Sequence, residues 1–381
     1  MANMNMDLDN FEPVARIVVI GVGGAGNNAV NRMMDEHIDN VEFYVLNTDK
    51  QALATSKAPN RIVIGEQVTA GLGAGGDPEV GKEAAIQSTD EIRDIVRGAN
   101  MVFIASGMGG GTGTGASPIV AQIAREEGAL TIAIVTRPFT FEGKTRIANS
   151  VAGLSELKDA VDSIIIVSND KLLMASGLVP ISQAFQESDR VLAQSVKTVT
   201  DLILLPAIIN LDFADVRSTL KNSGIALIGF GMGNGPNKAE DAAENAINSP
   251  LLEASISGAR RAICAVTCGV NVSLYEAEEC VNRIIEQAGS AIDIKFGVSI
   301  NDQLDDTIFV SVIAADFTEE YDFTSIPTFA HPQRSAIGSG VDEARKKAVS
   351  HQEGEIGAKE EEDSLSNTIL PDFLKGRLGD S

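Results

Sequence analysis

The residues of this chain with the clearest chemical potential lie in the stretch SGMGGGTGTGAS, residues 106–117. The backbone N–H groups of such glycines and the hydroxyls of Thr112 and Thr114 can donate hydrogen bonds to phosphate oxygens. The stretch does not match the common phosphate loop, because no Gly-Lys-Ser/Thr follows and the nearest downstream lysine is Lys144. A neutral donor set would require Mg²⁺ to balance the charge of a polyphosphate. The sequence therefore predicts a phosphate-binding loop without a charge of its own.

A second glycine-rich motif, GVGGAG at residues 21–26, has the spacing of the dinucleotide-binding fingerprint. It follows a β-rich run and precedes the helical stretch NNAVNRMMDE, and the acidic residue Asp49 follows the next β-rich run. Glycines at these positions let the backbone approach a phosphate, and the N-terminus of the helix supplies N–H donors. Taken alone, this motif would indicate an NAD-dependent oxidoreductase with Asp49 as the acidic residue of the fingerprint.

Two phosphate loops at one edge of a sheet favour a longer phosphate chain, such as that of a nucleoside triphosphate. The alternative is that both are glycine turns that only let a helix pack closely on a strand. A third glycine-rich stretch, TAGLGAGGDPEVGKEAA at residues 69–85, leads into a predicted helix with Asp77 as its cap and Pro78 at its first position. It could be a loop near the terminal phosphate or simply the start of a helix.

The elements that must position these loops alternate along residues 16–168. Short β-rich runs, several of them apolar throughout, are separated by glycine-containing turns and helical stretches. Strands that are buried on both faces and alternate with helices predict an α/β fold with a doubly wound parallel sheet, in which ligands bind at the carboxyl ends of the strands. The predicted strands are RIVVIG, EFYVLN, RIVIG, MVFIAS, LTIAIVT and SIIIVS.

A long central helix and a second, α+β domain are predicted next. Apolar residues recur at helical spacing through residues 184–205, and Pro206 closes the stretch. The runs GIALIGFGM, AICAVTCG, DIKFGVSI and TIFVSVIAA predict strands, with helices near 238–248 and 274–287. The predicted order is a disordered leader at 1–13, a nucleotide-binding domain at 14–183, the central helix at 184–206, a loop and helix at 207–221, the α+β domain at 222–317, a flexible linker at 318–366 and a terminal peptide at 367–381.

Composition excludes several classes of function. The formal net charge of −23 argues against a nucleic-acid surface, and no apolar run approaches the ~20 residues of a membrane helix. The three cysteines fit neither a disulfide framework nor zinc-type pairs, so we expect buried thiols in a reducing compartment. The acidic N-terminus lacks the basic region and apolar core of a secretory signal, which favours a cytoplasmic protein. The polar, charged stretch after Phe317 predicts a disordered C-terminal tail.

Three motifs in this order resemble the FtsZ family, the tubulin-like GTPases of the bacterial and plastid division ring. They are GGGTGTG at 109–115, PFTFEGKTR at 138–146 and NLDFADVRS at 210–218, and the resemblance covers residues 14–317. It implies a GTP-binding domain that holds GTP or GDP, with Mg²⁺ at the phosphates, between the sheet edge and the long helix. By position it implies a nucleotide site made of Gly23, Gly24, Ala25, Gly26, Asn27, Asn28, Ala74, Gly109, Gly110, Gly111, Thr112, Gly113, Thr136, Pro138, Glu142, Arg146, Asn169, Phe185 and Asp189.

Within this site the resemblance assigns Glu142 and Arg146 to the sugar, and Asn169 and Asp189 to the guanine. The chemistry of Asp189 fits this role independently. A carboxylate can accept hydrogen bonds from both the N1–H and the 2-amino group of guanine, and adenine lacks that pair of donors.

The segment NLDFAD, residues 210–215, has two explanations. From the sequence alone, Asn210 or Asp212 would cap a helix that carries Asp215 in its first turn, where the helix dipole favours acids. The resemblance instead implies a catalytic loop that enters the nucleotide site of the next subunit in a head-to-tail homopolymer. Asp212 and Asp215 would there polarise and position the attacking water, with Asn210 near the phosphate, so hydrolysis would depend on assembly.

The chain departs from the family pattern at a few positions. Leu204, Leu205 and Ala207 stand where a polar or basic pair and a glycine are usual, and Asp77 stands where asparagine is usual. A GTP-binding scaffold that assembles but hydrolyses slowly is therefore a further alternative.

The ending TILPDFLKGRL resembles the C-terminal peptide of the family. The resemblance implies a ligand for membrane-tethering and regulatory division proteins at the mid-cell division site, or in the plastid stroma, without direct membrane insertion. Its apolar residues are Ile369, Leu370, Phe373 and Leu374.

Overall fold

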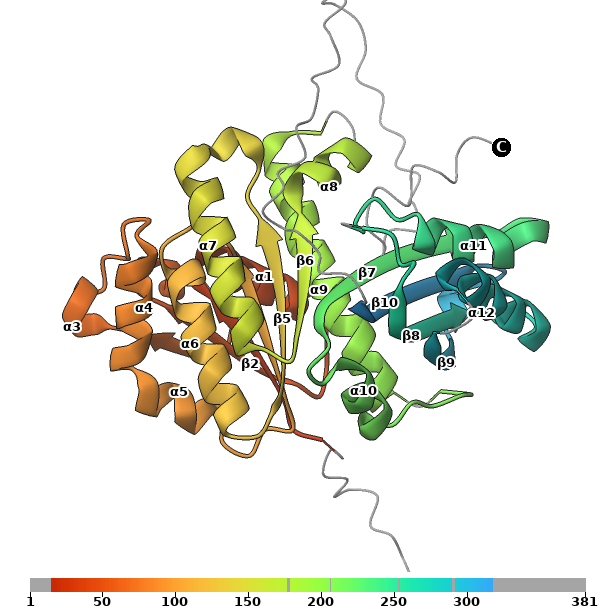
Figure 1. Ribbon diagram of the computed structural model, residues 1–381, viewed down its shortest axis with the longest axis horizontal. Helices are drawn as coiled ribbons and strands as arrows, with labels where there is room; N and C mark the ends of the chain where they lie inside the picture. The colour runs from red at the N-terminus through yellow and green to blue at the C-terminus, as the bar shows by residue number, and fades with distance from the viewer. Residues whose placement is uncertain (1–14, 177–178, 206, 253, 290–291, 318–381) are drawn as a thin grey trace, which may run out of the picture. The chain divides into compact units, whose positions relative to one another are not determined.

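A computed structural model describes the chain from Ala15 to Phe317, except residues 177–178, 206, 253 and 290–291 (Figure 1). The predicted leader, linker and terminal peptide therefore lie outside the described residues, and so do Ile369, Leu370, Phe373 and Leu374 of that peptide.

The N-terminal part is built on a parallel sheet with the strand order β3-β2-β1-β4-β5-β6. Every neighbouring pair in this series is parallel. The strands β1, β4, β5 and β6 are buried along nearly their whole length, as the apolar runs in their sequences predicted. The predicted doubly wound sheet is confirmed. The strands are β1 (Ile17–Val22), β2 (Glu42–Asn47), β3 (Asn60–Val63), β4 (Met101–Gly107), β5 (Leu130–Arg137) and β6 (Ser163–Ser168).

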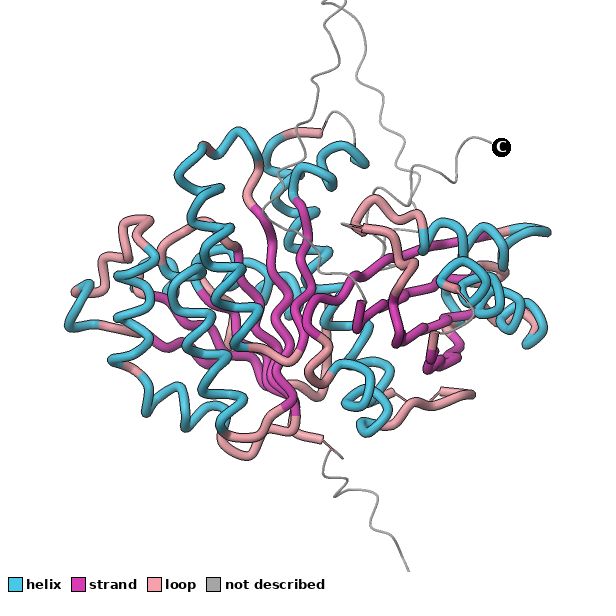
Figure 2. Tube along the Cα trace, viewed as in Figure 1, coloured by secondary structure: helices cyan, strands magenta, loops and turns pink. Residues whose placement is uncertain are grey.

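Helices cover the two faces of this sheet. In Figures 1 and 2 the front face carries α4 (Pro78–Gln87), α5 (Thr89–Val96), α6 (Thr112–Glu126) and α7 (Lys144–Ala160). The rear face carries α1 (Gly23–Asp35) and the long helix α9 (Ile181–Leu204), which pack against each other. The predicted helix after GVGGAG begins four residues earlier than expected, inside the glycine motif. Short helices α2 (Lys50–Ala54), α3 (Glu66–Thr69) and α8 (Asn169–Ser176) lie in the connections.

The predicted second domain continues the same sheet. β7 (Gly224–Gly233) starts parallel to β6 and then pairs with β10 (Ile308–Phe317) in the antiparallel direction. The sheet ends with β8 (Ala259–Cys268) and β9 (Asp293–Ile300), giving ten strands in one order. The helices are α10 (Phe213–Leu220), α11 (Lys238–Ile247) and α12 (Leu274–Ala288).

The cysteines lie in the apolar core of this second domain, as expected. Cys264, Cys268 and Cys280 are free thiols and are buried. Burial raises the pKa of Cys268 to about 11 and that of Cys280 to about 12, so neither thiol ionises near neutral pH. No helix in the described part of the chain could cross a membrane.

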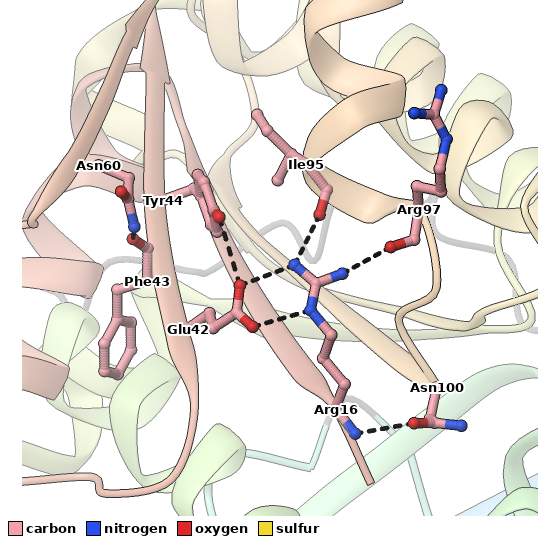
Figure 3. Close-up of polar contacts among 8 residues, drawn as sticks. All are labelled: Arg16, Glu42, Phe43, Tyr44, Asn60, Ile95, Arg97 and Asn100. Carbon is pink, nitrogen blue, oxygen red and sulfur yellow. Dashed lines mark hydrogen bonds and ion pairs between the residues drawn. The ribbon is translucent and has the colours of Figure 1, made fainter.

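A polar cluster fastens the amino ends of β1 and β2, where the described chain begins (Figure 3). The Arg16 guanidinium donates to both carboxylate oxygens of Glu42, at 2.8 and 2.7 Å, and to the carbonyls of Arg97 and Ile95. Tyr44 adds a hydrogen bond to Glu42 at 3.3 Å. The Arg16 charge and hydrogen bonds hold the pKa of Glu42 below its usual value.

Candidate functional site

The first two glycine loops meet at the carboxyl ends of the adjacent strands β1 and β4. Gly23 has a φ of +72°, and a Cβ atom at this position would lie 2.7 Å from the backbone nitrogen of Gly113. A Cβ on Gly107 would lie 2.6 Å from that of Ala25. Glycine is required because any side chain here would push the two loops apart. The geometry therefore brings together residues 23–26 and 109–113, as the sequence predicted.

The helices that follow these loops begin with free N–H groups. Neither α1 nor α6 has a side chain that caps its first turn, and neither carries an acidic residue there. By contrast, Asp77 accepts a hydrogen bond from the backbone N–H of Glu79 and caps α4, as predicted. Gly24, Ala25 and Asn28 are exposed at the start of α1. Two uncapped N-termini side by side form a site for a phosphate group.

The third glycine-rich loop and the start of α7 close around the second loop. A Cβ on Gly111 would lie 2.8 Å from the Cβ of Ala74. A Cβ on Gly109 would lie 2.8 Å from the carbonyl oxygen of Arg146 and 3.3 Å from Cγ of Pro138. Gly110 has open space, with no atom within 4 Å of the same position. These contacts place Ala74, Pro138 and Arg146 at the same edge of the sheet.

Residues at the end of β5 and in the turn after it complete this side of the site. The carbonyl of Thr136 accepts a hydrogen bond from the N–H of Met108, at 2.9 Å. Glu142 forms an ion pair with Arg146 and accepts a hydrogen bond from the N–H of Phe139, at 2.9 Å. The carboxylate expected at the sugar is therefore held in a fixed place by two partners.

A different set of residues lies where β6 ends and α9 begins. The amide oxygen of Asn169 accepts a hydrogen bond from Ser188 Oγ at 2.8 Å, which joins the end of the strand to the helix. Asp189 follows directly, and burial raises the pKa of its carboxyl to about 7, although the charge of Arg32 opposes the shift. Phe185 is 41 % exposed and contacts the buried Phe139 edge-on. An exposed ring beside a partly buried carboxylate can bind a flat base that donates hydrogen bonds.

Asn27, which the resemblance places at the nucleotide, and Asp49, the acidic residue of the fingerprint, both use their side chains within the fold. In the orientation that its neighbours favour, the Asn27 amide donates to the carbonyls of Gly21 and Gly23 and accepts from Asn47. Asp49 accepts hydrogen bonds from the N–H groups of Gln51 and Ala52, at 2.8 and 3.3 Å, and caps α2. Its carboxylate is thus engaged in the fold, which weighs against the role that an NAD-binding site would give it.

The segment 210–215 lies away from these residues. Asp212 caps α10 by accepting from the N–H of Asp215 at 2.7 Å, and Asn210 accepts from the N–H of Ala207 at 2.7 Å. Helix α9 has 24 residues and is therefore about 36 Å long; it leads from the Asn169 end of the sheet towards this segment. In Figure 1 α8 lies beyond the arrowheads of β5 and β6, whereas α10 lies at the other ends of the strands. The structure confirms the helix cap but does not bring Asn210, Asp212 or Asp215 to the glycine loops.

One residue at the site, Thr48, was not predicted from the sequence. Thr48, the first residue after β2, is fully buried, and its hydroxyl oxygen lies 2.7 Å from that of Thr112. A threonine that directly follows a buried parallel strand is a usable signal, because its position at the carboxyl edge can be predicted.

Comparisons with known proteins agree with this geometry. Residues 16–177 match the family model described as Tubulin/FtsZ family, GTPase domain, and residues 224–318 match the FtsZ family, C-terminal domain. A solved, empty FtsZ dimer from M. jannaschii is 41% identical and superposes with a TM-score of 0.76, covering 79% of this chain and 88% of its own. A tryptophan-to-tyrosine variant of FtsZ from that organism is 40% identical with the same TM-score, covering 80% and 91%.

A more distant structure shares the fold. CetZ2 from Haloferax volcanii, solved as a protofilament with GTPγS, is 21% identical with a TM-score of 0.68, covering 78% of this chain and 92% of its own. The family models, together with 41% identity over most of both chains, favour a tubulin-like GTPase over the alternative of an NAD-dependent oxidoreductase. The chain belongs to the FtsZ family, the tubulin-like GTPases of cell division.

Proposed function

We propose that the glycine loops of one copy bind GTP and that the loop and helix 207–221 of the next copy complete the hydrolytic site. The observation that carries this proposal is the separation within one chain of the phosphate-binding loops from Asp212 and Asp215 by the length of α9. A head-to-tail arrangement of copies would bring the two ends together. The solved FtsZ dimer supports association between copies.

The roles of the residues follow from what each can donate or accept. Residues 23–28 and 109–113, with Ala74, would bind the phosphates through backbone N–H groups and the Thr112 hydroxyl. Thr136, Pro138, Glu142 and Arg146 would bind the sugar side. Asn169, Phe185 and Asp189 would bind guanine. From the next copy, Asp212 and Asp215 would orient and polarise the attacking water, with Asn210 beside the phosphate.

Mg²⁺ fits this donor set as a companion of the nucleotide. Among the residues that the structure describes, no group of three or more His, Cys, Asp or Glu could hold a metal ion. Mg²⁺ keeps several waters and binds mainly through phosphate oxygens, so it does not need a cage of protein ligands. When bound it would offset the triphosphate charge that the neutral glycine loops leave unbalanced.

The partners and location proposed here follow the same family. Copies of this chain would form head-to-tail filaments in the cytoplasm at the division site. Residues 367–381 would bind the proteins that tether and regulate the filament. In this proposal GTP is bound by residues 14–183, which are followed by the central helix at 184–206, the loop and helix at 207–221 and the α+β domain at 222–317.

The proposal is tested by the GTPase rate per molecule as a function of protein concentration, with light scattering followed in parallel. We expect the rate per molecule to collapse below the concentration at which scattering disappears, because one copy holds half a site. A constant rate per molecule at every concentration, without scattering, would show that a single chain contains the whole site.

Two variants sharpen this experiment. Asp212→Ala should bind GTP and scatter light but release little phosphate, because its glycine loops are intact. Asp90→Ala removes an exposed acid from the first turn of another helix, α5, and should behave like the unaltered chain. If both variants lose the same fraction of GTPase activity, the loss would come from removing a negative charge and not from the position of Asp212.

A further inference from the structure

Thr48 lies at the junction of the phosphate-binding loops. Its side chain is completely buried, and its Oγ1 lies 2.7 Å from Oγ1 of Thr112, the first residue of α6. In the described part of the chain, the Thr48 hydroxyl has no hydrogen-bond partner other than Thr112. A buried hydroxyl without a partner is costly, so the pair is a fixed feature of the loop.

The backbone of the same residue holds the third glycine-rich loop. The Thr48 carbonyl accepts a hydrogen bond from the N–H of Gly73 at 3.1 Å and from the Thr69 hydroxyl at 3.3 Å. The next residues extend this contact, since the N–H of Lys50 donates to the carbonyl of Gly71 at 3.0 Å. Thr48 therefore contacts both the start of α6 and the loop that carries Ala74.

The direction of the hydroxyl pair decides what Thr112 can offer to a ligand. A hydroxyl has one proton and two acceptor sites, and phosphate oxygens only accept. If Thr48 donates to Thr112, the Thr112 proton remains free for a phosphate oxygen, and the two hydrogen bonds polarise each other. If Thr112 donates to Thr48, its proton is used up within the protein. A bound triphosphate selects the first arrangement.

We propose that Thr48 is a positioning residue of the nucleotide site: it orients the Thr112 hydroxyl toward the phosphates and holds loop 70–77 at a fixed distance from α6. This inference rests on the proposed function, in which Thr112 and Ala74 contact the phosphate tail. Because loop 70–77 then lies near the terminal phosphate, Thr48 matters more for GTP than for GDP.

The test compares Thr48→Val, which keeps the shape and removes the hydroxyl, with Thr48→Ser, which keeps the hydroxyl. Binding of a fluorescent, non-hydrolysable GTP analogue and of fluorescent GDP is measured below the assembly threshold, so that only one copy's half-site is read. We expect Thr48→Val to weaken analogue binding by roughly five- to tenfold, the size of a net hydrogen bond, with a smaller loss for GDP. Thr48→Ser should recover most of the affinity.

The matched control is Thr131→Val, at the start of β5, the opposite end of the parallel strands. Thr131 is also fully buried, and its hydroxyl donates to the carbonyl of Ala129. The control should lower the melting temperature without changing either affinity. Thr48→Ala serves as a second variant if Thr48→Val folds poorly. It should also weaken binding of the GTP analogue more than binding of GDP.

Two results would overturn the inference. If Thr48→Val lowers the melting temperature but binds both nucleotides like the unaltered chain, the hydroxyl pair only stabilises the fold. If GTP and GDP affinities fall equally and Thr48→Ser does not restore them, the hydroxyl has no directional role. Failure of the proposed function has a different signature, because the unaltered chain itself would then not bind the GTP analogue.

Discussion

In the proposed site, single residues would decide which nucleotide binds and at which pH. Asp189 is the clearest case, because its carboxyl is partly buried near the exposed ring of Phe185 and its pKa is raised to about 7 by desolvation. Guanine offers two donors to an ionised carboxylate and would bind it in preference to the protonated form. The charge state of this one residue would thus be linked to nucleotide binding near neutral pH.

We predict that GTP affinity falls as the pH decreases below 7. Binding requires ionised Asp189, so affinity is full above its pKa of about 7 and decreases by up to about tenfold per pH unit below it. The ligand-free protein shows the opposite trend in stability. Its Asp189 pKa lies above the unfolded value of about 3.9, so stability decreases as the pH rises from about 4 to 7. Titration of a fluorescent GTP analogue between pH 5.5 and 8.5 measures the first effect.

The same site gives a prediction for Asp189→Asn. The amide can donate a hydrogen bond to the 2-oxo group of xanthine, whereas it repels the 2-amino group of guanine, so the variant should bind XTP in preference to GTP. Its affinity for XTP should lack the pH dependence assigned to Asp189. Competition between the two nucleotides, measured on both proteins, checks the exchange. An Asp189→Asn protein that keeps its preference for GTP would remove Asp189 from the base-binding role.

Gly23 gives a prediction about backbone space. Gly23→Ala combines a positive φ with a Cβ contact of 2.7 Å to Gly113, so we expect nucleotide binding to be lost. The control Gly98→Ala has a similar φ of +76° but no atom within 4 Å of the new Cβ, so it isolates the backbone cost. That cost is about 1–2 kcal/mol. Equal effects of both changes on nucleotide affinity, measured with the fluorescent analogue, would contradict the contact between the loops.

At the scale of elements, local patterns predicted strands more reliably than they predicted how those strands combine. Apolar runs such as MVFIAS gave β4 within one residue, because a strand buried on both faces has a distinctive composition. Two features of the fold could not be predicted from the sequence. The start of α1 lies among glycines, which carry no helical pattern, and β7 pairs with both β6 and β10, which depends on contacts between distant segments.

In the candidate site, too, the sequence predicted some residues and not others. Glycines, Asp77 and the segment 210–215 were visible because turns and helix caps have local signatures. The pairing of Thr48 with Thr112 was not visible, since it joins residues 64 apart through the order of strands β2, β1 and β4. The antiparallel bridge between Ile209 and Val298, which holds the loop after α9, has no sequence pattern either.

The cluster around Arg16 belongs to this scale, because it joins two strands. We predict that Glu42→Gln lowers the free energy of unfolding by about 1 kcal/mol or less, since both side chains are partly exposed. The pKa of Glu42 is depressed, so the contribution is present above about pH 4.3 and is lost as the pH falls further. Urea unfolding at pH 7 and pH 3.5 measures both effects. Nucleotide affinity should not change, because the cluster lies at the amino ends of the strands.

At the scale of the whole molecule, the ends that would meet in a filament are apolar in part. The chain has a formal net charge of −23, so copies repel each other unless local contacts overcome the repulsion. Leu205 and Ile208 would supply such contacts at the start of the predicted loop and helix 207–221, because 47% and 61% of their surfaces are exposed. The hydrogen bond from the Ile208 N–H to the carbonyl of Val298, at 2.8 Å, keeps this loop in place.

We predict that Leu205→Ser raises the concentration required for assembly. Burial of a leucine side chain contributes about 1.5–3 kcal/mol, so the threshold should rise by roughly tenfold or more. The control is Ile86→Ser on α4, where an isoleucine is 53% exposed but does not belong to the loop and helix that follow α9. Light scattering over a range of protein concentrations gives the threshold. Similar shifts for the two variants would mean that Leu205 has no special place at the contact.

The most direct test of the shared site mixes two chains that cannot hydrolyse GTP alone. Asp212→Ala binds GTP but lacks the aspartate that orients water, and Asp189→Asn has an intact loop but binds XTP. We predict that an equal mixture, supplied with XTP and labelled GTP, assembles and releases labelled GDP, because Asp212→Ala sites receive the loop of their neighbours. If the mixture scatters light yet releases no more labelled GDP than either variant alone, each chain carries its own catalytic aspartate and the account is wrong.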